Sequence, residues 1–152
     1  MSLLIDSYGM HEPLVDFGKS NPVMGTCAGL IMMAKTVHDE RIKSLGFLDI
    51  VVDRNAYGRQ IESATEVVQY TFNTDHKLEL STTLIRAPKI SELGDNFHVI
   101  GKFNGSPVAV LSGHHLGLSF HPELDGIDIF HKILFDPDSQ VYYKKINQAY
   151  AA

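Results

Sequence analysis

Between residues 22 and 52 the sequence alternates between two kinds of apolar pattern. Pro22 to Met24 is a short apolar run, and Phe47 to Val52 is a longer one rich in β-branched residues, as expected of buried strands. From Ala28 to about Glu40 the apolar residues recur at helical spacing, which predicts an amphipathic helix between the two strands. Strands on both sides of one helix favour an α/β domain over a helical bundle or a sandwich.

The remainder of the chain contains a series of shorter apolar segments separated by polar or Gly-containing turns. The further strands are predicted at residues 67–72, 82–85, 98–103, 107–111 and 116–120. A short helix is expected at residues 127–134, and the apolar residues of the last segment are spaced as in an amphipathic helix. We therefore expect one domain over residues 1–152, with a mainly parallel central sheet flanked by helices and with antiparallel additions.

Composition restricts the classes of protein to which the chain can belong. Its 152 residues are 44% hydrophobic and 20% charged, as in ordinary globular proteins. The formal net charge is -5 and the basic residues are scattered, so we expect neither nucleic acid nor a membrane surface as a partner. No apolar run approaches membrane-spanning length, and a cytoplasmic location is expected.

The single cysteine, Cys27, lies where the first predicted strand ends and the helix begins. Gly25 and Gly29 flank it at two residues on either side, which is typical of a nucleophile elbow, where the backbone is strained and main chain approaches main chain closely. A helix N-terminus also favours the thiolate, which is the attacking form. The alternative is a small core residue in a Gly-rich turn, and the pentapeptide alone does not decide between the two.

His121 and Glu123 follow another predicted strand and are separated by Pro122. The proline restricts His121 to extended backbone and stiffens the turn, so imidazole and carboxylate are held at one strand end. A carboxylate bonded to one ring nitrogen fixes the tautomer, while the other nitrogen takes a proton from a nucleophile. Each residue alone is better explained as an ordinary turn histidine or a surface charge. Together with the elbow they predict a Cys-His-Glu triad.

Two motifs, residues 25–31 (Gly-Thr-Cys-Ala-Gly-Leu-Ile) and 119–124 (Ser-Phe-His-Pro-Glu-Leu), resemble those of the class I, triad-type glutamine amidotransferases. Residues 48–53, 54–60 and 85–88 narrow the resemblance to the glutaminase subunit of the pyridoxal 5'-phosphate synthase complex. The resemblance extends from near Met1 to about Leu134. It implies a flavodoxin-like, class I glutamine amidotransferase-like fold and hydrolysis of L-glutamine to glutamate and ammonia.

The resemblance also implies roles for particular residues. Cys27, His121 and Glu123 match the family's triad, and Arg54, Ile85 and Arg86 match its glutamine contacts. A planar guanidinium suits the α-carboxylate of glutamine. The backbone N–H of Ala28 is the expected oxyanion donor, and Arg59 is interpreted as a surface charge.

The family's partner is a barrel-shaped synthase subunit that uses the ammonia to build pyridoxal 5'-phosphate, and no cofactor is implied for the glutaminase. Family members begin with a strand, a glutamine-containing loop and a Gly-Gly-Glu-Ser turn that supplies a second oxyanion donor. These stretches do not occur in this sequence. The expectation is an N-terminally truncated version, shorter by roughly 50 residues, which hydrolyses glutamine more slowly than a longer one.

The sequence also allows three other interpretations. The chain could be a non-catalytic module that only binds the synthase subunit, or an amidotransferase subunit that serves another acceptor. A metal site at His114, His115 and His131 is disfavoured, because adjacent side chains rarely face one ion and Ser112-Gly113 indicates a hairpin turn with solvated histidines. We therefore predict no metal.

Overall fold

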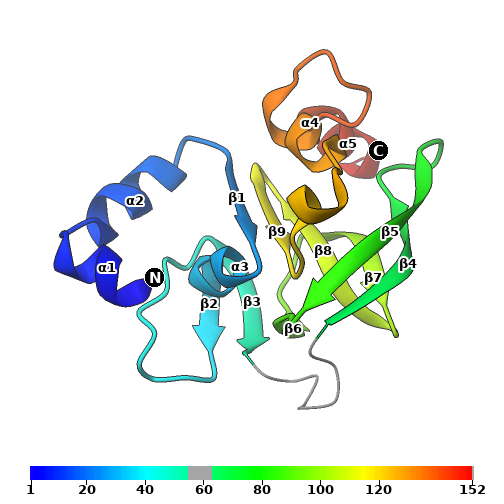
Figure 1. The fold of residues 1–152 in the computed structure, drawn as a ribbon. Coiled ribbons are helices and arrows are strands. Elements are labelled where there is room, and N and C mark those ends of the chain that lie inside the picture. Colours follow the sequence, from blue (N-terminus) through cyan, green and yellow to red (C-terminus); the bar gives the residue numbers. More distant parts are fainter. Residues whose placement is uncertain (55–62, 152) are drawn as a thin grey trace.

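The structure is a computed structural model that describes residues 1–54 and 63–151. Its helices are α1 (Ser2–Ser7), α2 (His11–Gly18), α3 (Ala28–Met33), the 3-10 helix η1 (Pro122–Asp125), α4 (Ile129–Phe135) and α5 (Tyr143–Ala151). Its strands are β1 (Val23–Thr26), β2 (Ala34–Val37), β3 (Leu48–Asp53), β4 (Ser63–Thr71), β5 (Lys77–Ile85), β6 (Lys89–Leu93), β7 (His98–Phe103), β8 (Ser106–Ser112) and β9 (His115–Leu118). Figure 1 shows their arrangement, with α4 and α5 on one side and α1 and α2 on the other.

The described strands form two sheets. The larger has the order β1-β9-β8-β7-β4-β5, and the smaller has the order β2-β3-β6. The α/β class is confirmed, but most of the described strand pairs are antiparallel; β1 with β9 and β2 with β3 are the parallel ones. The reason lies in the connections. From β4 onward short turns join successive strands, as at Asn104-Gly105, where both residues have the positive φ of a two-residue hairpin turn.

The strand directions determine which ends meet. In the larger sheet β1, β9, β7 and β5 run in one direction, and β8 and β4 run in the other. The carboxyl ends of β1, β9 and β5 therefore lie along the same edge of this sheet. This edge carries the segments that follow these strands, which begin at Cys27, Ser119 and Arg86.

Two hydrophobic clusters form the core. In the first, four aromatic rings pack between the larger sheet and α4, and the Phe120 ring lies 5.9 Å from Tyr70 and 5.3 Å from Phe130, centroid to centroid. Because Phe120 is fully buried, it anchors the backbone immediately before His121. In the second cluster α3 packs on the smaller sheet through Leu30 and Met33. Both clusters thus support the segments at the edge of the larger sheet where the carboxyl ends of β1, β9 and β5 lie. This edge is the site edge.

The sequence predicts one helix too long and misses one strand. The helix predicted from residue 28 to about 40 ends at Met33, and residues 34–37 form β2, which pairs with β3. Backbone pairing with β3 and the β-branched residues Thr36 and Val37 favour a strand there over a continued helix. Strand β6 was not predicted at all; it pairs antiparallel with β3.

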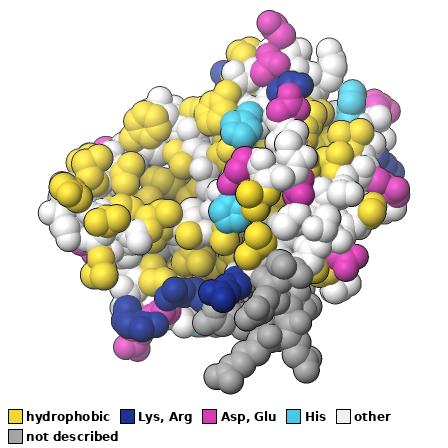
Figure 2. Space-filling view, in the orientation of Figure 1, with side chains coloured by type: hydrophobic (Ala, Val, Ile, Leu, Met, Phe, Trp, Pro, Cys, Tyr) yellow, Lys and Arg dark blue, Asp and Glu magenta, His cyan; other side chains and the backbone are white. Residues whose placement is uncertain are grey.

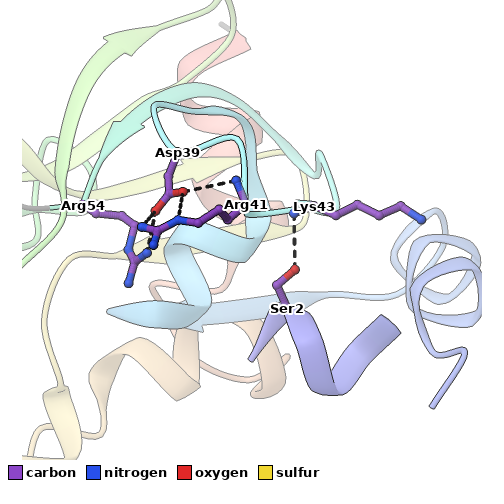
Figure 3. A network of polar contacts seen from close by, with 5 residues as sticks. All are labelled: Ser2, Asp39, Arg41, Lys43 and Arg54. Carbon is purple, nitrogen blue, oxygen red and sulfur yellow. Dashed lines mark hydrogen bonds and ion pairs between the residues drawn. The ribbon is translucent and has the colours of Figure 1, made fainter. Parts of the chain in front are cut away.

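Apolar side chains are exposed over α1 and α2, as Figure 2 shows on the side of the molecule that carries these helices. Leu3 and Tyr8 are each 78% exposed. Both helices are bonded to the segment after β2, because the Lys43 N–H donates to Ser2 Oγ at 3.3 Å (Figure 3) and His11 Nε2 lies 3.0 Å from the Ser44 carbonyl oxygen. Of the helices that the structure describes, none has the length and apolar character needed to cross a membrane.

Candidate active site

Cys27 and His121 both follow strands that lie next to each other. Strands β1 and β9 pair in parallel with Thr26 opposite Leu118, so Cys27 is one residue beyond this pair and His121 is three residues beyond it. The Cys27 N–H donates to the Leu118 carbonyl oxygen at 2.9 Å and extends the ladder by one bond. The fold therefore brings the predicted nucleophile and the predicted base to the same place on the site edge.

The backbone of Cys27 has the conformation expected of a nucleophile elbow. Its φ is 47° and its ψ is -103°, a region that L residues rarely occupy and that costs about 1–3 kcal/mol. A Cβ added to Gly25 would lie 2.7 Å from the Gly29 carbonyl group and 2.5 Å from Met33 Sδ, so glycine is required there. A Cβ added to Gly29 would meet nothing within 4 Å. The predicted close approach to main chain is confirmed at Gly25. At Gly29 the predicted need for a small residue is wrong, because a side chain there would have open space.

The Cys27 thiol is half-buried, and its environment favours the protonated form. Desolvation raises the pKa of the thiol, a hydrogen bond from the Ala28 N–H lowers it, and the negative charge of Glu123 raises it further. The net pKa is raised, whereas the sequence predicted activation at a helix N-terminus. Helix α3 has only six residues, and burial outweighs its favourable end. A thiolate at neutral pH therefore requires a base that accepts the proton.

His121 and Glu123 form the hydrogen-bonded pair that the sequence predicted. His121 Nδ1 lies 2.7 Å from Glu123 Oε1, and His121 has the extended backbone (φ -112°, ψ 91°) expected before proline. Some desolvation raises the pKa of Glu123, but its own backbone N–H and the His121 ring lower it, and the net pKa is below the ordinary value. Glu123 is therefore an anionic acceptor, and Nε2 of His121 is left for proton exchange.

Among the hydrogen bonds of the described residues, none joins the Cys27 thiol to His121. The thiol and the imidazole share the site edge, and Glu123 is near enough for its charge to raise the pKa of Cys27. The structure thus brings the three residues to one region and shows one of the two hydrogen bonds of a triad. Catalytic hydrogen bonds often shorten only when substrate is bound.

Ile85 and Arg86 are at the carboxyl end of β5 and are both exposed. Arg86 has φ 43°, an uncommon value for a residue other than glycine, and the next two residues, Ala87 and Pro88, are buried. The buried residues Ala87 and Pro88 therefore anchor the strained turn, while Ile85 and Arg86 remain accessible at the site edge.

Arg54 follows β3, and its guanidinium is bound by a carboxylate that sequence reasoning did not identify. Arg54 Nη1 donates to Asp39 Oδ2 at 2.7 Å, and Arg41 donates to both oxygens of the same carboxylate at 2.8 and 2.7 Å (Figure 3). The two guanidinium groups hold the pKa of Asp39 far below its ordinary value. Because two arginines share one carboxylate, the Arg41–Asp39–Arg54 cluster has an excess positive charge. Asp53, the residue before Arg54, pairs with His38; Arg59, which the sequence indicates as a surface charge, lies outside the described residues.

The three histidines considered for a metal site, His114, His115 and His131, lie in different environments. His114 and His115 are at the β8–β9 turn, where His115 is only 9% exposed and stacks on Phe47 with ring centroids 5.1 Å apart, while His131 is exposed on α4. The hairpin turn is confirmed, but the prediction that both histidines are solvated is wrong for His115. Within residues 1–54 and 63–151, no group of three His, Cys, Asp or Glu side chains is arranged to hold a metal ion.

A sheet with these strand-end segments, an elbow cysteine and a His-Glu pair is the arrangement of a glutamine amidotransferase. Residues 1–136 match the sequence profile of the SNO glutamine amidotransferase family, and the chain belongs to that family. A crystal structure described as a glutamine amidotransferase superposes with a TM-score of 0.80 at 32% identity, covering 89% of this chain and 71% of that one.

Several curated relatives carry one name, pyridoxal 5'-phosphate synthase subunit PdxT. The relative from Shouchella clausii (strain KSM-K16) is 45% identical over 82% of this chain and 63% of its own length. The relative from Brevibacillus brevis is 40% identical over 90% of this chain and 70% of its own, and that from Thermoplasma volcanium is 42% identical over 81% and 60%. The chain thus spans less than two thirds of the length of the Shouchella clausii relative.

Proposed function

We propose that this chain is a single glutaminase domain that hydrolyses L-glutamine to L-glutamate and ammonia. The observation that carries the proposal is the pairing of β1 with β9, which brings the elbow at Cys27 next to the segment that contains the His121–Glu123 pair. Membership of the glutamine amidotransferase family supports it. The bent, strained backbone at Cys27 supports it further, because such strain persists where function requires it.

In the proposed reaction the Cys27 thiol transfers its proton to His121 Nε2, and the sulfur attacks the side-chain carboxamide carbon of glutamine. Glu123, bonded at Nδ1, stabilises the imidazolium that forms. The tetrahedral intermediate collapses to a thioester, the C–N bond breaks, and the imidazolium proton leaves with ammonia. Water, deprotonated by His121, then hydrolyses the thioester to glutamate and restores the thiol.

The N–H of Ala28 is the proposed donor to the oxyanion. It lies next to the reacting atom, because its proximity lowers the pKa of the Cys27 thiol against the larger effect of burial. When the thiolate bonds to carbon, the developing negative charge moves to the carboxamide oxygen, and a backbone donor at the start of α3 can follow it with little rearrangement.

Arg54, Ile85 and Arg86 are proposed to bind the amino acid portion of glutamine. The excess positive charge of the Arg41–Asp39–Arg54 cluster suits the α-carboxylate. The exposed Ile85–Arg86 turn presents backbone groups to the α-amino group at the same edge as Cys27. Glutamine would thus be held by its amino acid end while its carboxamide reaches the thiol.

We further propose that the ammonia is used for pyridoxal 5'-phosphate synthesis by a separate barrel-shaped synthase subunit. The names of the relatives from three organisms support this partner. A cytoplasmic location is proposed with it, because a catalytic thiol must remain reduced and the cytosol keeps thiols reduced. Co-purification with the synthase subunit and glutamine-dependent formation of pyridoxal 5'-phosphate test this part, and an unrelated acceptor subunit in the complex would overturn it.

The central experiment measures glutamate release from glutamine by the wild-type chain and by Cys27→Ala, together with labelling by a glutamine-mimicking diazoketone. We expect hydrolysis to be lost in Cys27→Ala, and we expect one adduct at Cys27 that glutamine prevents from forming. Labelling that glutamine does not prevent, or equal rates for the two proteins, would overturn the proposal. A chain that binds the synthase subunit without any hydrolysis would be the non-catalytic module instead.

A further inference from the structure

Asp125, at the end of η1, makes two short hydrogen bonds to a strand 42 residues earlier in the chain. Its Oδ2 accepts from the Thr83 N–H at 2.7 Å, and its Oδ1 accepts from Thr83 Oγ1 at 2.6 Å. Both carboxylate oxygens are therefore used on one residue of β5. Bonds to an ionised acceptor are stronger than neutral ones, and a paired geometry also fixes orientation.

Thr83 is a suitable anchor because β5 is the edge strand of the larger sheet. Its N–H is bonded to Asp125, outside the sheet, while its side chain also meets Thr65 of β4, with the two Oγ1 atoms 3.0 Å apart. An edge strand presents backbone donors that need partners, and a side-chain carboxylate satisfies one here. The anchor is thus connected to β4 and not only to the edge.

The two ends of this contact lie beside the two halves of the proposed glutamine site. Asp125 is two residues after Glu123, and Thr83 is two residues before Ile85. Strands β9 and β5 are separated within the sheet by β8, β7 and β4. The Asp125–Thr83 contact therefore joins the segment after β9 directly to β5, although β9 and β5 lie four positions apart in the sheet order. Figure 1 shows the curved sheet in which β5 and β9 are drawn.

We propose that Asp125 is a positioning residue that fixes the His121–Glu123 pair relative to the Ile85–Arg86 turn by holding Thr83 with both carboxylate oxygens. This inference rests on the proposed glutaminase function. Asp125 does not touch the reacting atoms; it sets the distance between the group that accepts the thiol proton and the group that holds the amino acid end of the substrate.

The turn at η1 has internal restraints that hold it folded independently of the Asp125–Thr83 contact. The Ile127 N–H donates to the Pro122 carbonyl oxygen at 2.9 Å, Gly126 has the left-handed conformation that ends the helix, and Phe120 anchors the entry to the turn. None of these restraints involves the Asp125 side chain. Removal of the carboxylate is therefore expected to leave η1 folded and to release it from β5.

The test compares glutamine hydrolysis by wild type, Asp125→Ala, Asp125→Asn, Thr83→Ser and Thr83→Val, with Asp128→Ala as the matched control. Asp128 is an exposed aspartate three residues further on, paired with Lys132 and outside the proposed site. Because small misplacements of reacting groups reduce rates by up to about a hundredfold, Asp125→Ala should lower kcat/KM by about tenfold or more, with a lower kcat and a higher KM. Asp128→Ala should match wild type.

Conservative variants and the rate of Cys27 alkylation distinguish a positioning role of Asp125 from a purely structural one. Thr83→Ser keeps both donors and should retain wild-type activity, whereas Thr83→Val loses the hydroxyl donor and Asp125→Asn loses one acceptor, so both should fall between wild type and Asp125→Ala. In folded Asp125→Ala, labelling of Cys27 by a glutamine-mimicking chloroketone should slow by about tenfold or more. Alkylation by iodoacetamide, which does not use Ile85 or Arg86, should slow much less.

Each outcome decides one question. If the wild-type chain shows neither hydrolysis nor glutamine-protected labelling, the proposed function falls and this inference falls with it. If the wild type is active and Asp125→Ala has the same kcat/KM and labelling ratio as Asp128→Ala, the positioning role is overturned and the glutaminase assignment stands. If Asp125→Ala does not fold, Asp125→Asn and Thr83→Val decide, and wild-type kinetics in both would overturn the inference.

Discussion

At the scale of single residues, Cys27 combines an unfavourable backbone with an unfavourable protonation state. Its positive φ costs free energy, and burial raises the pKa of its thiol. A residue that served only to fill the core would be better replaced by an amino acid without either penalty. The position therefore places the sulfur at the site edge at a cost in stability.

Replacement of Cys27 should reveal this strain. We expect Cys27→Gly to have a higher free energy of unfolding than Cys27→Ala, by about 1 kcal/mol, because only glycine adopts positive φ without steric penalty. Both variants lack the thiol, so their difference reports the backbone alone. Urea unfolding measures it, and a less stable Cys27→Gly would show that the backbone at the elbow is relaxed.

The ion pair between Arg54 and Asp39 predicts a competition at the proposed carboxylate site. An ion pair at the protein surface contributes up to about 1 kcal/mol, and the Arg54 side chain of this pair is 44% exposed. Asp39→Asn should therefore free the Arg54 guanidinium and lower the KM for glutamine by about twofold to fivefold. The matched control is Asp49→Asn, which breaks the exposed Lys35 pair and should leave KM unchanged. A higher KM in Asp39→Asn, measured by glutamate release, would mean that Asp39 orients Arg54 for substrate.

At the scale of elements, the junction of β1 and α3 depends on one of its two glycines. Gly25→Ala forces a methyl group against the Gly29 carbonyl and should lower the free energy of unfolding by about 1–3 kcal/mol. Gly29→Ala adds a methyl group in open space on α3 and should be neutral or stabilising by up to about 1 kcal/mol. Urea unfolding of the two variants provides the comparison, and equal effects would contradict the packing described here.

The elements differ in how far the sequence predicts them. Strands β1 and β3 and the elbow between them were predictable, because local apolar runs and glycine spacing determine them. Helix α3 was predicted too long, since the residues of β2 continue the apolar spacing and only pairing with β3 makes them a strand. The Asp39–Arg54 and Asp125–Thr83 contacts were missed because they join residues 15 and 42 positions apart, and no local pattern indicates such contacts.

The environment of His115 shows the same limit. Its position in a polar-looking turn predicted exposure, but the ring of Phe47, distant in the sequence, stacks on it and excludes water. For the proposed site as a whole, the motifs identified Cys27, His121 and Glu123, while the way in which their segments are held together required the sheet topology.

At the scale of the whole molecule, the buried His115 makes stability depend on pH. Desolvation and the neighbouring His114 lower the pKa of His115 from 6.5 to about 4. The folded state keeps this ring neutral, whereas the unfolded chain takes up a proton as the pH falls below 6.5. The contribution of His115 to stability is therefore present above pH 6.5 and is lost progressively as the pH falls to 4.

We expect the free energy of unfolding to fall by about 2 kcal/mol between pH 7.5 and pH 5 through this residue. His115→Phe, which keeps an aromatic ring against Phe47, should lose this part of the pH dependence. The exposed His76 offers the control, and His76→Gln should behave as wild type. Urea titrations at the two pH values measure the effect; an unchanged pH dependence in His115→Phe would assign the loss to other groups.

The parallel pairing of β1 with β9 has a consequence for the timing of activity during synthesis. The segment of the proposed nucleophile follows β1, whereas the proposed base follows β9, which is the last of the described strands to leave the ribosome and can pair with β1 only then. Contacts between such distant segments form late in folding. An unfinished chain would therefore contain Cys27 without the segment of the proposed base, and the proposed hydrolysis of glutamine would begin only after the sheet has closed.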